Sequence, residues 1–248
     1  MTQPTFYVSP EQQIKDRAEF SRSGINKGRS VIVARYGDGI LFITENRSPS
    51  LHKISEIYDR IGFAGVGKYN EFENLRVAGI RHADIRGYAY DRRDVTGRML
   101  AGAYGQILGT IFSSVMEKPY EVELIIAEVG ETPDTDHIFQ VSFDGSITQE
   151  TEFIVIGGAA QRISDNFREK YSTSLSLGEC ISLAQVALGS DARGVQPLAH
   201  GDLEVAILDR TRTQERKFRR LRGEEITSTS QPVKAVRTRT SAKKVADQ

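Results

Sequence analysis

The distribution of apolar residues divides the chain of 248 residues into short β-rich runs and longer segments with helical spacing. At the N-terminal end, Ser9, Pro10 and Gln12 predict the start of a helix. Serine caps free amides, proline fits the first helical position, and glutamine three residues after the serine completes a capping box. We expect this helix to run to about Ser23 and to end at Gly24. Its thin apolar stripe favours packing against a neighbouring molecule.

Short β-rich runs follow this helix and are separated by turn residues. The runs 31–34 and 40–44 flank Gly37-Asp38-Gly39 and predict a hairpin, because Asp-Gly supplies positive φ at low cost. The runs 54–58 and 61–66 repeat the pattern, and two successive hairpins imply an antiparallel sheet. Later runs predict a second sheet and then two closing strands; they lie at 122–129, 138–143, 153–156, 203–208 and 218–221.

Four further segments have the apolar spacing of helices, at 69–85, 94–116, 159–171 and 176–190. Asp94 is expected to cap the second of these, in which two adjacent apolar stripes predict burial over much of the girth. A row of small residues in that helix, from Gly97 to Gly109, permits close approach of another backbone. Ser176 and Glu179 form a capping box for the last helix. The order of elements predicts two antiparallel sheets with helical layers outside them.

Composition and charge change this picture only at the C-terminal end. The chain has 33 basic and 33 acidic residues, so its body has no basic excess that would attract nucleic acid. Residues 226–248 carry a charge of +4 and no aromatic residue, and cannot bury enough apolar surface to offset their ordering entropy. We therefore expect a flexible arm at 1–8, a folded domain at 9–225 and a disordered basic tail at 226–248.

The chain offers few groups for independent chemistry. Its single cysteine, Cys180, excludes an internal disulfide and is expected to be a small core residue. The four histidines have no metal-ligand spacing, so neither a metal nor a cofactor is expected. No apolar run approaches the roughly 20 residues that cross a bilayer, and the first residues contain no apolar signal region. These features predict a cytoplasmic protein without membrane contact.

Four stretches of the sequence have a recognisable pattern. Residues 50–64 read SLHKISEIYDRIGFA, and residues 67–76 read GKYNEFENLR. Residues 86–98 read RGYAYDRRDVTGR, and residues 118–124 read KPYEVEL. Together they closely resemble the α-type subunit of the bacterial 20S proteasome core found in actinobacteria. The resemblance runs from about Phe6 to Ile226 and omits only the extreme arm and the tail.

The resemblance implies an α+β fold, a four-layer αββα sandwich of the N-terminal-nucleophile hydrolase type with an extra N-terminal helix. It also implies outer heptameric rings in an α, β, β, α stack. The implied partners are neighbouring α-type subunits, β-type subunits, a proteasome-activating AAA ATPase ring and protein substrates. In that family only β-type subunits cut peptides, through a threonine at a new N-terminus. Here Arg29 stands between Gly28 and Ser30 and has no hydroxyl, so no catalytic residue is expected in this chain.

The resemblance assigns Lys53 to a pocket between neighbouring subunits. In α-type relatives the corresponding lysine binds the C-terminal carboxylate of the activating ATPase, a task that suits a compact and mobile cation. Glu19 matches an acid that borders the pocket, while Gly28 and Gly67 match glycines that leave room for the carboxylate. The alternative interpretation is that Lys53 is an exposed loop lysine without a partner.

The same resemblance, together with position, assigns a gate to the N-terminal segment. Phe6, Tyr7 and Val8 supply apolar side chains to flexible arms that plug an axial pore, and Pro10 starts the helix that carries them. Phe20 matches an aromatic residue that supports the open gate, although many relatives have tyrosine there. Closure would be an order–disorder switch, and a docked partner opens it only by binding the open arrangement more tightly.

Two other functions compete with a gating subunit. A self-processing peptidase of the threonine or serine type would be cut after Gly28 and would use Ser30 as a nucleophile. A nucleic-acid binder would act through the basic tail, 226–248, and its binding would depend on salt.

Overall fold

The apolar residues of strand β1 (Val31–Tyr36) alternate between two separate cores. Val31 and Val33 face one core, whereas Ile32 and Ala34 face the other. Successive side chains of a strand point to opposite faces, so β1 needs cover on both sides. This double burial explains why its sequence is almost continuously apolar.

The computed structural model describes residues 9–191, 194–195 and 198–229. These residues form two five-stranded antiparallel sheets. The first has the order β12-β11-β2-β1-β8, with β2 (Gly39–Glu45), β8 (Phe153–Ile156), β11 (Leu203–Asp209) and β12 (Phe218–Leu221). The second has the order β3-β4-β5-β6-β7, with β3 (Ile54–Tyr58), β4 (Ile61–Gly67), β5 (Val122–Glu128), β6 (His137–Val141) and β7 (Ile147–Glu150). Short strands β9 (Ser190–Asp191) and β10 (Gly194–Val195) pair separately.

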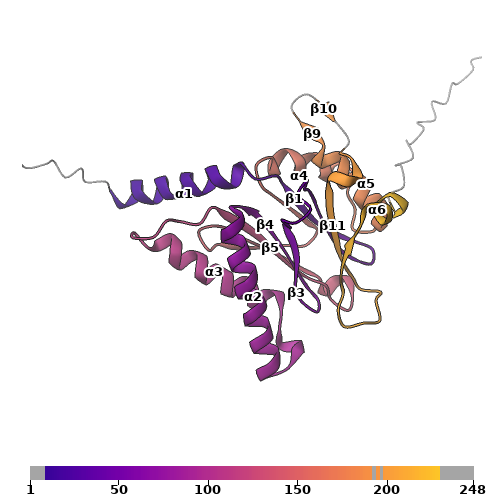
Figure 1. Cartoon of the computed structure of the whole chain (residues 1–248), viewed down its shortest axis with the longest axis horizontal. Helices are drawn as coiled ribbons and strands as arrows, with labels where there is room; N and C mark the ends of the chain where they lie inside the picture. Colours follow the sequence, from indigo (N-terminus) through magenta and orange to yellow (C-terminus); the bar gives the residue numbers. More distant parts are fainter. Residues whose placement is uncertain (1–8, 192–193, 196–197, 230–248) are drawn as a thin grey trace, which may run out of the picture.

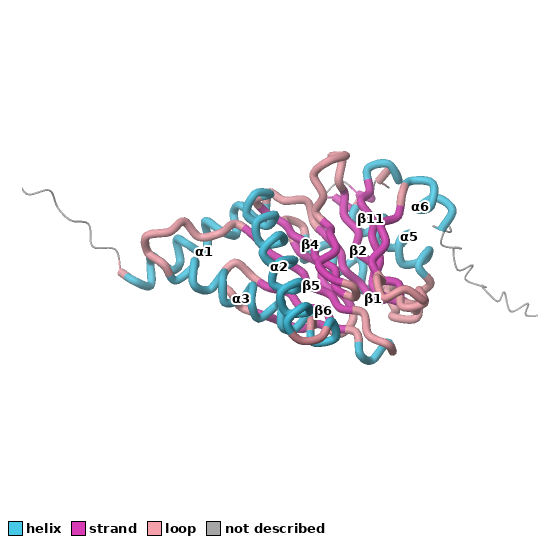
Figure 2. Tube along the Cα trace, turned by 60° about the horizontal axis from the view of Figure 1, so that its bottom comes forward, coloured by secondary structure: helices cyan, strands magenta, loops and turns pink. Residues whose placement is uncertain are grey.

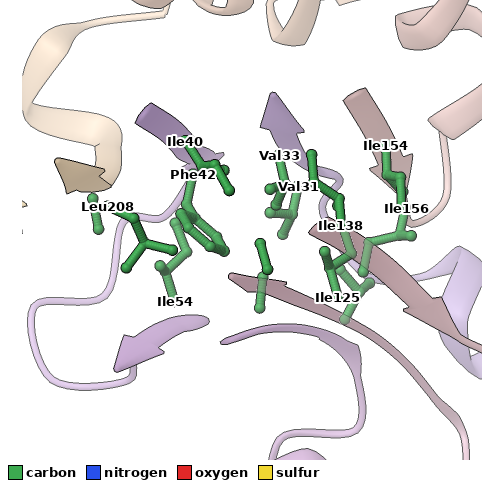
Figure 3. Close-up of a cluster of buried hydrophobic side chains, with 14 of the residues drawn as sticks. Val31, Val33, Ile40, Phe42, Ile54, Ile125, Ile138, Ile154, Ile156 and Leu208 are labelled. Carbon is green, nitrogen blue, oxygen red and sulfur yellow. The ribbon is translucent and has the colours of Figure 1, made fainter. Parts of the chain in front are cut away.

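The two sheets pack face to face around an apolar core. Figure 3 shows Val33 and Phe42 of the first sheet pointing toward Ile54, Ile125 and Ile138 of the second. All five side chains are buried, and each buried side chain of this size contributes about 1.5–3 kcal/mol to folding. The contact between sheets is therefore a major source of stability.

Helices cover the outer face of each sheet, as Figure 2 shows. The first sheet is covered by α4 (Ala160–Arg168), α5 (Leu177–Leu188) and α6 (Gly223–Thr229). The second is covered by α2 (Tyr69–Ala89) and α3 (Gly97–Ser113). The expected αββα sandwich is thus confirmed, and the extra helix α1 (Pro10–Asn26) extends past its end (Figure 1). Within the described residues, none of the helices combines the length and apolar character that crossing a membrane requires.

The start of α1 is as predicted, but its end is not. The Ser9 hydroxyl accepts a hydrogen bond from the Gln12 amide at 3.3 Å. The Gln12 side chain instead donates to Asp16 at 2.7 Å, so the returning half of the capping box is absent. The helix continues through Gly24 to Asn26, because the buried side chain of Ile25 packs into the core between the sheets.

The prediction for α3 needs two corrections. Thr96 caps the helix by accepting from the Met99 amide at 3.2 Å, while Asp94 belongs to a short 3₁₀ turn before it. One apolar stripe is buried, with Tyr104 at its centre, whereas Ile107 on the neighbouring stripe is exposed. Because the helix covers a sheet on one side only, Ile107 and Val115 of the neighbouring stripe remain exposed, while Met99 packs against the core.

Strand pairing also differs from the predicted arrangement. The two N-terminal hairpins lie in different sheets, and β8, which was expected in the second sheet, pairs with β1 in the first. All four residues of β7 are exposed, which is why no apolar run marked this strand.

The predicted disordered tail begins inside α6, where Ile226 is 1% exposed and packs in the core beneath the helices. The predicted core position of Cys180 is confirmed, since its side chain is fully buried.

Replacing Tyr104 with phenylalanine should stabilise the isolated subunit. Its hydroxyl is buried between α2 and α3 and has no hydrogen-bond partner among the described residues. A buried donor without a partner costs about 1–3 kcal/mol, and Tyr104→Phe removes it while keeping the ring. We expect the free energy of unfolding in urea to rise by about 1 kcal/mol. A fall in that free energy would show that the hydroxyl is favourable in the native state.

Candidate functional site

Lys53 lies at the end of the sandwich where α1 joins β1. It directly precedes β3 and is half-buried. Its ammonium donates a hydrogen bond to the backbone carbonyl of Arg29 at 2.8 Å. Its own carbonyl accepts from the Gly65 amide at 3.0 Å, which joins it to β4. The cation is thus held beside the chain segment that connects α1 to the first strand.

Gly28 and Gly67 lie beside each other, and contacts within their own chain require both to be glycine. A Cβ atom on Gly28 would lie 2.5 Å from Cγ1 of Val66 and 3.2 Å from the amide of Gly67. Gly67 has a φ of +110°, and a Cβ atom there would lie 1.9 Å from the carbonyl oxygen of Glu121. Both positions therefore exclude side chains for internal reasons. The clearance for an incoming carboxylate stays a prediction.

A Gly67→Ala substitution should destabilise the subunit itself. The backbone conformation is unfavourable for alanine, and the new methyl group would overlap the carbonyl oxygen of Glu121. We expect the free energy of unfolding to fall by at least about 2 kcal/mol. Urea denaturation of the isolated chain measures it. Normal stability together with a loss of partner binding would instead support a role confined to the pocket.

The environment of Lys53 lowers its pKa to about 8. Burial is the main cause, because it disfavours the charged ammonium, and the positive charge of Arg29 acts in the same direction. The carboxylates of Glu204 and Glu45 oppose this shift. An additional negative charge near Lys53, such as a bound carboxylate, would therefore stabilise the charged form of its side chain.

The predicted gate and pocket residues on α1 lie apart from this group. Glu19 is exposed, and its side chain forms no hydrogen bond or ion pair with the described residues. Phe20 is 45% exposed, and the ammonium of Lys118 lies 5.3 Å from its ring centre. Pro10 occupies the exposed first turn of the helix. The other predicted gate residues, Phe6, Tyr7 and Val8, lie outside the described residues.

An arginine that the sequence analysis missed anchors α1 to α3. The guanidinium of Arg17 donates to the carbonyl oxygens of Ile111 and Phe112, both at 3.0 Å, and of Glu117 at 2.9 Å. Ile111 and Phe112 lie in the last turn of α3, where the helix dipole favours a cation, and Glu117 lies in the segment that follows the helix. Any movement of α1 must therefore break or carry these three bonds.

The environment of Ser30 bears on the peptidase alternative. Ser30 is 6% exposed, and its hydroxyl accepts a hydrogen bond from the amide of Ala159 at 3.2 Å. A cavity of about 240 Å³ lies beside it and is also lined by Arg29 and Glu45, which form an ion pair. In the part of the chain that the structure describes, the Lys53 ammonium donates to the carbonyl of Arg29 and to no side-chain hydroxyl. Ser30 therefore supports the turn before α4.

The described residues contain no group of three or more histidine, cysteine, aspartate or glutamate side chains that could hold a metal ion.

The sequence analysis also missed Glu204, a buried acid whose oxygens accept from the backbone amides of Lys53 and Ile54. A signal was present, because Glu204 interrupts the otherwise apolar run LEVAIL in β11. The site thus consists of a cation, two close-packed backbone segments and a buried carboxylate behind them.

Comparison with known proteins identifies the family. A model of the family described as Proteasome subunit matches residues 25–208. A protein of a Nocardioides species is 58% identical over 217 residues, which cover 88% of this chain and 85% of its own length. Relatives from Streptomyces scabiei and Acidothermus cellulolyticus are 56% and 55% identical, covering 89% and 92% of this chain and 90% and 97% of their own lengths. All three are named proteasome subunit alpha. The chain therefore belongs to the proteasome subunit family.

Proposed function

We propose that this chain is a non-catalytic α subunit of a 20S proteasome core in the cytoplasm. In this role it forms outer heptameric rings with its own copies, stacks on β-type subunits and controls the entry of protein substrates. The observation that carries the proposal is the junction between α1 and β1, where Lys53 contacts the backbone of Arg29. A cation is present at this junction, and the residue before Ser30 has no hydroxyl for attack on a peptide.

The docking part of the proposal rests on the electrostatics of Lys53. Its ammonium is half-buried, and the backbone carbonyl of Arg29 is its only hydrogen-bond acceptor among the described residues. An ammonium has three donors, so two remain for the C-terminal carboxylate of an activating ATPase. A charge-assisted hydrogen bond of this type is about twice as strong as a neutral one. The pocket would open toward a neighbouring α subunit, with Glu19 at its border.

The gating part rests on the connection between α1 and the sandwich. Residues 1–8 precede α1. Arg17 of this helix is hydrogen-bonded to the end of α3, and its Phe20 ring lies against the ammonium of Lys118. A carboxylate that binds near Gly28, at the other end of α1, can shift this helix and the arm it carries. Such coupling requires that the partner bind the open arrangement more tightly than the closed one.

The self-processing peptidase remains the competing function, and intact mass separates the two. Cleavage after Gly28 would release the first 28 residues, including all of α1 and its three bonds to α3. The proposal predicts an uncut chain that hydrolyses no peptide when purified alone. Proteolysis that co-purifies with this chain and disappears in a Ser30→Ala variant would refute it.

Co-production with a β-type subunit tests the assembly directly. We expect a particle with the mass of two α rings and two β rings, and peptide cleavage that depends on the β-type threonine. The isolated chain provides the matched measurement. A cleavage-competent particle that forms without this subunit would contradict its assignment as the outer ring.

Stimulation by the ATPase should weaken as the pH rises through about 8. The ammonium of Lys53 must carry its proton to bind a carboxylate, and burial together with Arg29 lowers its pKa to about 8. Below that pH the cation is present. Above it the ATPase concentration needed for half-maximal stimulation should rise, approaching about tenfold per pH unit. A Lys53→Arg particle, whose guanidinium stays charged, provides the control. Equal pH profiles for the two particles would contradict the assignment.

A further inference from the structure

Glu204 is a buried carboxylate directly behind Lys53. Its side chain is 5% exposed, and both of its oxygens accept hydrogen bonds. One oxygen accepts from the amide of Ile54 at 3.2 Å and from the guanidinium of Arg220 at 2.5 Å. The other accepts from the amide of Lys53 at 3.0 Å and from the Asn46 side chain at 2.7 Å. Four donors from three chain segments, Asn46, Lys53–Ile54 and Arg220, thus converge on one group.

The strand that carries Glu204 makes this arrangement unusual. In β11, Ala206 and Leu208 face the core between the sheets, and the twofold alternation places Glu204 on the same face. An apolar side chain is expected there. A buried carboxylate is costly unless it is fully hydrogen-bonded, and replacement of such a group by an apolar residue is often neutral or stabilising. Stability alone therefore does not account for the glutamate.

The hydrogen bonds of Glu204 fix where the Lys53 side chain begins. The amide of Lys53 is held by Glu204, and its carbonyl is held by the amide of Gly65 at 3.0 Å. The next residue is held at both ends as well, because Arg220 donates to the carbonyl of Ile54 at 2.6 Å. With its backbone clamped, the lysine side chain reaches the carbonyl of Arg29 at 2.8 Å. A side chain fixed in advance loses less entropy when a ligand binds.

We propose that Glu204 is a positioning residue for the docking of a partner carboxylate at Lys53. It holds the lysine backbone from behind, aims the ammonium along the α1–β1 junction and leaves the ligand-facing donors free. Arg220, on the neighbouring strand β12, locks the carboxylate in place. This inference rests on the proposed docking function and adds a residue to it.

The glutamate also acts on Lys53 through its charge. Arg29 and burial lower the pKa of the lysine, whereas Glu204 and Glu45 raise it. His52 and Arg220 contact Glu204 from its other side. Removing the negative charge of Glu204 should lower the pKa of Lys53 further, so that the cation is lost at a lower pH. A group that merely stabilised the fold would not shift this titration.

The test compares assembled particles that carry Glu204→Gln with unaltered particles. The variant keeps the side-chain volume, but its NH2 group replaces one carboxylate oxygen. It therefore faces either the donors of Ile54 and Arg220 or those of Lys53 and Asn46. Peptide cleavage is followed against the concentration of the purified ATPase ring, and stimulation is expressed relative to each particle's own basal rate. We expect the half-maximal concentration to rise about tenfold, as a loss of 1.4 kcal/mol produces. At saturating ATPase the maximal stimulation should recover, and the pH midpoint should move downward.

Three comparisons make the outcome decisive. Glu169→Gln, a matched change on the exposed end of α4, should leave the half-maximal concentration and the pH midpoint unaltered. Arg220→Lys should shift the half-maximal concentration in the same direction as Glu204→Gln. If the Glu204→Gln subunit does not assemble, the Arg220→Lys particle provides the test instead. In a Lys53→Ala particle, Glu204→Gln should have no additional effect. An unchanged half-maximal concentration and pH midpoint in Glu204→Gln would overturn the inference. If Lys53→Ala also left stimulation intact, the docking function itself would fail.

Discussion

Deletion of residues 1–8 should raise the rate at which the assembled particle cleaves a short peptide by about tenfold. The deleted segment would plug the axial pore through its apolar residues, Phe6, Tyr7 and Val8. If the open arrangement is the minor state, populated at about 10%, removal of the plug makes every particle open. The rate constant at limiting peptide concentration is the quantity to compare, because entry limits the reaction there.

The matched control for this deletion removes the same number of residues, 241–248, from the other end of the chain. Particle mass must be normal for both proteins, so that altered assembly is not mistaken for an open gate. ATPase stimulation of the deleted particle should fall by the same factor by which its basal rate rises. Equal rates for the deleted and unaltered particles would argue against the gate.

A Lys53→Ala substitution should abolish stimulation by the ATPase ring. Loss of the ammonium removes a charge-assisted hydrogen bond worth about 1.5–3 kcal/mol, which lowers affinity about tenfold to more than a hundredfold at each pocket. A ring partner engages several pockets at once, so these losses multiply and binding fails at accessible concentrations. The observable is cleavage with ATPase divided by cleavage without it, which should fall to about one.

Two variants determine whether the effect belongs to this particular lysine. Lys170→Ala removes the same charge from the exposed end of α4 and should retain full stimulation. Lys53→Arg keeps the charge but replaces a compact ammonium by a planar guanidinium, so we expect partial stimulation. Full stimulation of the Lys53→Ala particle would refute the docking role.

The local features of the sequence were the most reliable guides to the fold. The runs 54–58, 153–156 and 218–221 coincide with β3, β8 and β12. The Ser176–Glu179 capping box is present at the start of α5, with both hydrogen bonds formed. These signals involve residues close together in the chain, so they can be recognised before the packing around them is known.

The sequence said less about which strands and helices pack against each other. The break at Asp59-Arg60 indicated the β3–β4 hairpin, but nothing in either hairpin shows that β1 pairs with β8 or β2 with β11. Such pairings join segments more than 100 residues apart, and they depend on which apolar faces meet when the chain collapses. The exposed stripe of α3 has the same origin, since periodicity marks an apolar face but not its cover.

The candidate site shows the same difference between features that are local in the sequence and contacts between distant segments. The order of amino acids by itself determined the family pattern, the lysine at position 53, the lack of a hydroxyl at Arg29 and the glycines at positions 28 and 67. Only the tertiary structure decided that the ammonium contacts the carbonyl of Arg29 and that Glu204, some 150 residues away, holds its backbone. The physical reason is the distance along the chain over which each feature is set. Side-chain identity and short spacings are properties of the chain, whereas a buried charge acquires its donors only when distant strands come together.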